Sequence, residues 1–163
     1  MPGLPPFDRV VREHGPVVLR VCRALVGGDD ADDAWQETFL AALRSYPGLD
    51  PGTNLRAWLV TVAHHRCVDL LRTRARRALV AAQLPQPATE PGPEEAAEGA
   101  AEDRELHALV AALPERQRLA VALHHLGGLP YADVAALVGG TPEAARRAAA
   151  DGVAALRRTG RLS

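Results

Sequence analysis

The sequence predicts an all-α protein with two small helical domains joined by a flexible acidic linker. Apolar residues recur at helical spacing through most of the chain, and no stretch alternates apolar and polar residues as a β-strand does. Residues 84–105 are rich in Pro, Glu, Ala and Gly and offer little apolar surface to bury. A length of 163 residues suits two small domains. We therefore expect domains at residues 1–83 and 106–163.

The distribution of charge supports this division. The net charge is only −1, but residues 1–83 carry 11 arginines against nine acidic residues, and residues 106–163 carry seven against four. The linker holds one arginine and seven acidic residues. Two mildly basic domains therefore flank an acidic connector.

Composition also excludes several classes of protein. No apolar run reaches the 18 residues that a membrane span needs, and the first residues lack the pattern of a signal peptide. We expect a cytoplasmic protein without membrane insertion. Cys22 and Cys67 fall within apolar helical stripes and lack metal-ligand spacing, so we expect buried thiols, no metal and no cofactor.

The first helix is expected over residues 7–25, where apolar residues keep helical spacing. Gly15 and Pro16 predict a kink or break within it, because proline removes a helix hydrogen bond. Gly27 and Gly28 are expected to end it.

The second helix should begin at Asp29 or Asp30, either of which can cap its free N–H groups. Trp35, Phe39 and Leu43 form its predicted apolar stripe, and the helix is expected to stop before Pro47-Gly48.

The third helix, expected over residues 54–77, combines an apolar stripe with a basic end. Arginines crowd its last turns, where they complement the helix dipole and offer positive charge to a polyanion. Taken alone, the segment favours an ordinary core helix with a solvated charged end, because runs of charge usually just face solvent.

After the linker, helices are expected over residues 106–113, from Pro114 to about Leu126, and over residues 131–138. Gly139-Gly140 breaks the last of these, and Thr141 is placed to cap one more helix that has Pro142 in its first turn. A short helix, a glycine turn and a capped helix are typical of a helix-turn-helix.

Several segments in this order resemble the small, two-domain, extracytoplasmic-function (ECF) type of bacterial RNA polymerase sigma factor. The segments are DADDAWQETFL at 30–40, NLRAWL at 54–59, VDLLR at 68–72, LPERQR at 113–118 and LPYADVA at 129–135. The resemblance implies a sigma region 2-like bundle before the linker and a region 4-like helix-turn-helix domain after it.

The resemblance implies that the acidic helix docks on the coiled coil of the β′ subunit of core polymerase. Asp33, Gln36 and Glu37 are the candidate contacts, because acidic and amide groups suit basic partner side chains. Complementation of the helix dipole could account for Asp33 but not for Gln36.

The third helix corresponds to the element that recognises and melts the −10 region of promoter DNA. Asn54 is the candidate for a polar base contact. Trp58 could stack on a base, although its place in the apolar stripe favours packing in the core. The candidate phosphate contacts are Arg56, Arg66, Arg72, Arg74, Arg76 and Arg77.

The resemblance implies that the helix after Thr141 reads the −35 element through Arg146 and Arg147, with Thr141 and Arg157 as further candidate contacts. It departs from the family pattern, because three expected polar or basic positions hold Ala148, Asp151 and Val153. Gly152 also weakens the helix by about 1 kcal/mol relative to alanine. We therefore expect −35 recognition that is weak or that needs help from another protein.

The resulting expectation is a sigma factor, not an enzyme, that directs promoter-specific initiation and is regulated by an anti-sigma factor. The alternative is a sigma-like regulator that binds polymerase or another regulator but has weak or lost −35 recognition. A third reading, a helical phosphohydrolase using His64, His65 and Asp69, is disfavoured because adjacent histidines diverge by about 100° on a helix.

Overall fold

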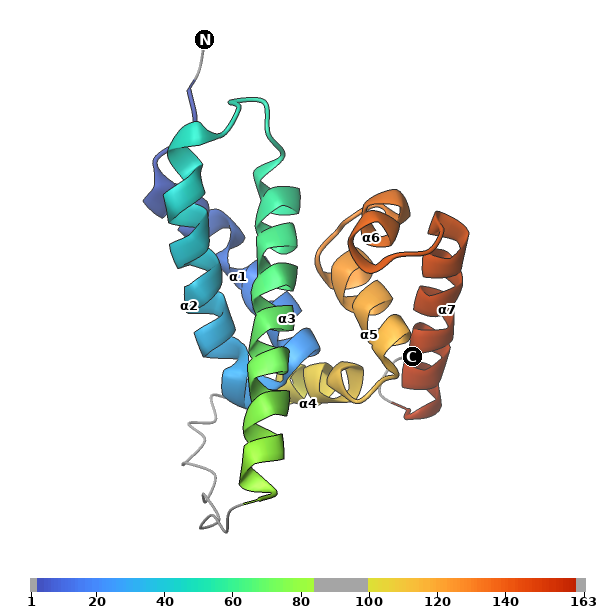
Figure 1. Ribbon diagram of the computed structural model, residues 1–163. Helices are drawn as coiled ribbons and strands as arrows, with labels where there is room; N and C mark the ends of the chain where they lie inside the picture. The colour runs from blue at the N-terminus through green and yellow to red at the C-terminus, as the bar shows by residue number, and fades with distance from the viewer. Residues whose placement is uncertain (1–2, 84–99, 161–163) are drawn as a thin grey trace.

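The computed structural model describes residues 3–83 and 100–160, called here the N-terminal and C-terminal halves. All regular structure within these residues is helical (Figure 1). Most of the predicted linker lies outside the described residues, and the chain is already helical from Ala100, within the stretch expected to be linker.

The N-terminal half is a bundle of three helices: α1 (Phe7–Val26), α2 (Gly28–Ser45) and α3 (Leu55–Ala81). A short 3-10 turn, η1 (Tyr46–Gly48), follows α2. Helix α1 continues through Gly15 and Pro16, so the alternative of a break there is wrong. The absent side chain at Gly15 lets Trp35 approach the backbone, and its indole Nε1 donates to the Gly15 carbonyl at 3.0 Å.

Helix α2 packs through small residues more than the sequence pattern indicates. Its buried face holds Ala31, Ala34, Thr38, Phe39 and Ala42. The predicted stripe is right for Phe39 and for half-buried Trp35, but wrong for Leu43, which is 50% exposed. Alanines allow the backbone of α2 to approach its neighbours closely, and this turns the larger leucine away from the core. The helix also begins at Gly28, one residue before the expected aspartate caps.

Helix α3 begins with a side-chain cap from Asn54, whose Oδ1 accepts from the Ala57 N–H at 3.1 Å. Its buried residues are Leu59, Val60, Ala63, His64 and Cys67. The thiol of Cys67 hydrogen-bonds to Cys22 of α1, and this contact together with burial raises its pKa. Both cysteines are free and buried, as the sequence predicts.

The C-terminal half contains α4 (Ala100–Ala111), α5 (Glu115–Ala120), a π-helical segment η2 (Val121–Leu126), α6 (Tyr131–Val138) and α7 (Pro142–Arg158). The expected cap on α7 is confirmed, since Thr141 Oγ1 accepts from the Ala144 N–H at 3.1 Å. Gly139 and Gly140 form the preceding turn with φ of +90° and +88°, a conformation that favours glycine. The predicted helix-turn-helix is thus α6 and α7.

The two halves pack against each other. Helix α4 lies against α1, and η2 also contacts α1. Buried apolar residues of both halves belong to a single cluster, which includes Val18 and Leu59 from the first half and Val110 and Leu123 from the second. In the part of the chain that the structure covers, no helix has the length and apolar character needed to cross a bilayer.

Gly152 gives a first test of this packing. A Cβ at Gly152 would lie 2.7 Å from Val121 Cγ2, so the glycine lets α7 approach η2. We expect Gly152→Ala to lower the free energy of unfolding by about 1–2 kcal/mol, because the overlap outweighs the gain of about 1 kcal/mol in helix propensity. Urea unfolding followed by circular dichroism measures this change.

Gly28→Ala, at the first residue of α2, is the matched control. A Cβ at Gly28 would meet no heavy atom within 4 Å, and its φ is not positive. This helical substitution should leave stability unchanged or raise it by up to about 1 kcal/mol. Equal effects of the two substitutions would contradict the packing argument.

Two buried histidines predict a dependence of stability on pH. Burial lowers the pKa of His64, helped by neighbouring His65, and burial is also the main cause of the lowered pKa of His107. Since the unfolded chain then binds more protons, the free energy of unfolding should fall as pH drops below about 6.5. Urea unfolding between pH 7.5 and 5.5 measures this slope. The double variant His64→Asn with His107→Asn should flatten it, whereas exposed His65→Asn should retain most of it.

Candidate functional site

The three residues predicted to bind core polymerase share one exposed face of α2. Asp33, Gln36 and Glu37 are all exposed, and their spacing of three and four residues places them side by side. Leu40 and Leu43 continue this face and are 49% and 50% exposed. The structure therefore adds an apolar part to the acidic surface, which we call the α2 docking face (Asp33, Gln36, Glu37, Leu40 and Leu43).

The sequence reasoning missed both leucines: Leu43 was counted in the apolar stripe, and Leu40, beside that stripe, was given no role. A partial signal was available in the small residues. Ala31, Ala34, Thr38 and Ala42 recur at spacings of three and four and define the buried side of α2. Leu40 and Leu43 lie outside that repeat, but so does buried Phe39, so the repeat alone does not separate exposed from buried apolar residues.

Two of the predicted −10 residues have structural roles at the start of α3. Asn54 is exposed and its carbonyl oxygen caps the helix, which leaves its amide nitrogen as the group that can reach a ligand. Trp58 is half-buried against the core, with its ring centroid 6.4 Å from that of Tyr46. This position agrees with the expectation that Trp58 packs against the core and does not stack on a base.

Three of the predicted phosphate-binding arginines are engaged within the molecule. Arg56 Nε donates to the carbonyl of Gly127 at 3.2 Å, and its Nη2 lies 3.5 Å from the Leu126 carbonyl. Arg66 pairs with Asp69 at 3.3 Å. Arg74 forms an ion pair with Asp30 at the start of α2.

The other three, Arg72, Arg76 and Arg77, are exposed and form no ion pair within the described residues. They gather near the C-terminal end of α3, and Arg56 lies about 24 Å away along the same helix. The structure therefore does not bring the predicted arginines together in one patch. A basic end of α3 is open to solvent, while Arg56 is held by the C-terminal half.

The predicted −35 arginines occupy different surroundings on α7. The Arg146 guanidinium lies over the ring of Tyr131, 5.2 Å from its centroid, and that ring stacks on His124 at 3.8 Å. This contact fixes α7 to α6 and contributes roughly 0.5–1 kcal/mol at an exposed site. Arg157 is exposed near the other end of the helix.

Arg147 lines a shallow cavity of about 460 Å³ between α5 and α7 that also contains Arg116 and Thr141. Glu143 and Asp151 line the same cavity and reduce its attraction for phosphate. Arg116 was not predicted, although the segment LPERQR contains it. Its position beside Arg147 becomes visible only when α5 and α7 are packed together.

Comparison with known proteins agrees with this arrangement. Residues 10–77 match the family model for sigma-70 region 2, and residues 103–156 match the model for sigma-70 region 4. The first match covers α3 through its arginine run, and the second covers the helix-turn-helix.

Two curated relatives are ECF sigma factors. The chain is 34% identical to the ECF RNA polymerase sigma factor SigE of Mycolicibacterium smegmatis over 143 residues, which are 84% of this chain and 54% of that protein. It is 37% identical to SigD of Mycobacterium tuberculosis over 139 residues, 80% of this chain and 66% of that protein. The chain thus spans between about half and two thirds of the length of these curated relatives.

Two solved structures share the fold. The sigma factor RpoE of Bartonella quintana, in complex with the anti-sigma factor NepR, aligns with a TM-score of 0.73 at 20% identity, covering 96% of this chain and 98% of that chain. CnrH, in complex with the cytosolic domain of CnrY, aligns with a TM-score of 0.64 at 21% identity, covering 94% and 86%. With regions 2 and 4 present in order and with these relatives, the chain belongs to the ECF group of the sigma-70 family of RNA polymerase sigma factors.

Proposed function

We propose that this protein is a dissociable specificity subunit that binds core RNA polymerase and directs initiation at a particular set of promoters. The observation that carries the proposal is the ordered match to regions 2 and 4, combined with an exposed acidic and apolar face on α2. The proposal gives the chain a role in recognition and assigns it no catalytic residue.

The α2 docking face would contact the β′ coiled coil of core polymerase. Asp33 and Glu37 can pair with basic partner side chains, and Gln36 can donate and accept hydrogen bonds. Leu40 and Leu43 would bury their exposed surface in the same contact, since exposed apolar side chains beside a polar rim are typical of protein interfaces.

Helix α3 would supply the −10 contacts. The arginines at its C-terminal end can follow the DNA backbone, and the amide of Asn54 can reach a base at the other end of the helix. Arg56 can join this surface only after leaving the carbonyls of Leu126 and Gly127. The promoter-bound form therefore requires the two halves to move apart.

Helix α7 would contact the −35 element through Arg147 and Arg157, with Arg146 partly committed to Tyr131. The nearby acidic side chains keep this contact weak, so α3 carries most of the DNA affinity. We also propose an anti-sigma partner, because the neighbouring RpoE was solved with the anti-sigma factor NepR.

Reconstitution with a bacterial core polymerase tests the assembly step. The double variant Asp33→Arg with Glu37→Arg should weaken binding to core at least about tenfold, because it reverses the charge of the α2 docking face. Fluorescence anisotropy of the labelled protein titrated with core measures this affinity. Asp8→Arg, on exposed α1, is the matched control and should bind as the parent does. If the parent protein neither binds core nor supports run-off transcription from a promoter library, the proposed function is wrong.

The arginines at the end of α3 predict a graded salt dependence of DNA binding. Removing Arg76 or Arg77, each exposed and without an ion pair among the described residues, should lower the slope of log K against log salt by about one. Arg74→Ala should have a smaller effect, since Asp30 already neutralises that side chain. Anisotropy titrations of the holoenzyme on a forked promoter fragment at several salt concentrations measure these slopes. Equal slopes for Arg74→Ala and Arg76→Ala would contradict the assignment.

A further inference from the structure

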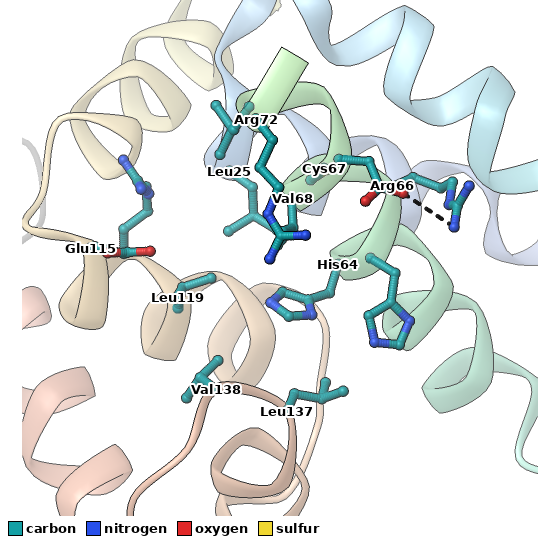
Figure 2. Close-up of a pocket in the computed structure, with 14 residues that line it drawn as sticks. Leu25, His64, Arg66, Cys67, Val68, Arg72, Glu115, Leu119, Leu137 and Val138 are labelled. Carbon is teal, nitrogen blue, oxygen red and sulfur yellow. Dashed lines mark ion pairs between the residues drawn. The ribbon is translucent and has the colours of Figure 1, made fainter. Parts of the chain in front are cut away.

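A cavity of about 510 Å³ lies between the two halves of the molecule. Helices α1 and α3 form one side of it and α5 and α6 the other. Its volume is in the range of cavities that hold small-molecule ligands. Figure 2 shows the Arg72 guanidinium and the His64 ring on one side, with Leu119, Leu137 and Val138 on the other.

Three polar nitrogens of residues lining this cavity are buried without a hydrogen-bond partner: His64 Nδ1, Arg66 Nε and Arg118 Nε. His64 is only 6% exposed. Burial lowers its pKa, so the ring is neutral at pH 7 and one tautomer donates through Nδ1. A buried donor without an acceptor costs about 1–3 kcal/mol, which an acceptor-rich ligand would recover.

The charges around the cavity favour an anion. Three arginines line it, and Arg72 has no ion pair within the described residues. Of the two carboxylates, Asp69 is already paired with Arg66 at 3.3 Å, while Glu115 is exposed at the edge of α5. The remaining net charge is positive, and guanidinium groups bind phosphate and carboxylate oxygens in a fixed fork.

Apolar side chains line both sides of the cavity. Leu25 and Val68 come from the N-terminal half, and Leu119 and Val138 come from the C-terminal half. A ligand that places an oxyanion against the arginines would therefore rest its remaining surface on aliphatic side chains. This combination distinguishes the cavity from the open basic end of α3, which offers charge without an enclosing apolar wall.

We propose that this cavity binds a small molecule that carries a phosphate or carboxylate oxyanion on a planar or apolar body and contacts both halves of the protein. Its oxyanion lies against Arg72, Arg118 and the Nδ1 of His64. Its body lies on the leucine and valine wall.

The consequence for transcription depends on the proposed function. Arg66 and Arg72 are candidate contacts to promoter phosphates, so a ligand in the cavity occupies groups that the DNA would use. Because the ligand contacts both halves, it also favours the form in which Arg56 is held by Gly127. Bound ligand then lowers the affinity for promoter DNA, and bound DNA lowers the affinity for the ligand by the same factor.

Isothermal titration calorimetry on the full chain at low salt tests the site without polymerase or DNA. Inorganic phosphate, pyrophosphate and ATP probe the phosphate class, citrate and salicylate probe the carboxylate class, and sodium chloride at equal ionic strength is the control. We expect saturable 1:1 binding of ATP or salicylate, tighter than that of inorganic phosphate because the wall adds apolar contact.

Variants on opposite sides of the cavity should act in opposite directions. Arg72→Ala on α3 should weaken binding about tenfold or more, and Glu115→Gln on α5 should strengthen it several-fold by removing a repelling charge. Arg12→Ala removes the same charge as Arg72→Ala but lies outside the cavity, so it should leave the affinity unchanged.

The proposal is overturned if none of the probes binds saturably, or if Arg72→Ala and Glu115→Gln bind as the parent does. Those outcomes would leave the proposed function intact, because core binding and run-off transcription are measured without the ligand. Conversely, a failed reconstitution would not remove a 1:1 site seen by calorimetry.

Discussion

Helix α1 supports both halves of the molecule, because it packs on α2 and α3 on one side and on α4 and η2 on the other. Val18, Val21 and Cys22 have no exposed surface, so the part of α1 between the two halves is fully buried. The buried apolar cluster therefore runs from one half into the other instead of forming two separate cores. This shared packing brings Arg56 to the Leu126 and Gly127 carbonyls and leaves the cavity between the halves. The same α2 face that stays outside this packing remains open for a partner.

Local signals in the sequence predicted the positions of the helices and the cap of α7 well, but not the start of α2. Thr141 and the two glycines before it predicted the start of α7 because capping and positive φ are properties of single residues and their neighbours. Asn54 shows how such signals can point to two roles at once. It was singled out for a base contact, and it is also the cap of α3. The family resemblance identified which helices matter, and the docking and DNA roles of their residues remain proposals.

Features that depend on the approach of two helices could not be predicted in the same way. Leu43 fits an apolar stripe as well as Phe39 does, and only the close packing of the alanines decides which of them is buried. In the sequence, Gly152 only lowers the helix propensity of α7. In the structure, a Cβ at this position would lie 2.7 Å from Val121 Cγ2, so the glycine is needed for close packing. The arginines of α3 look equivalent in the sequence. In the structure, Arg74 pairs with Asp30 and Arg56 bonds to the Gly127 carbonyl, whereas Arg76 and Arg77 form no ion pair within the described residues. Which side chains are buried, closely packed or paired therefore depends on distances between elements that are far apart in the chain.

The π-helical segment η2 has a consequence for how the two halves are matched. The Gly127 N–H bonds to the Ala122 carbonyl five residues back, at 2.8 Å, so the turn contains one more residue than an α-helical turn. That extra residue sets the direction of the Leu126 and Gly127 carbonyls that receive Arg56. Removing one residue from 121–126 would restore an α-helix and rotate everything after it by about 100°. The length of this turn therefore determines whether Arg56 can reach the Leu126 and Gly127 carbonyls of the C-terminal half.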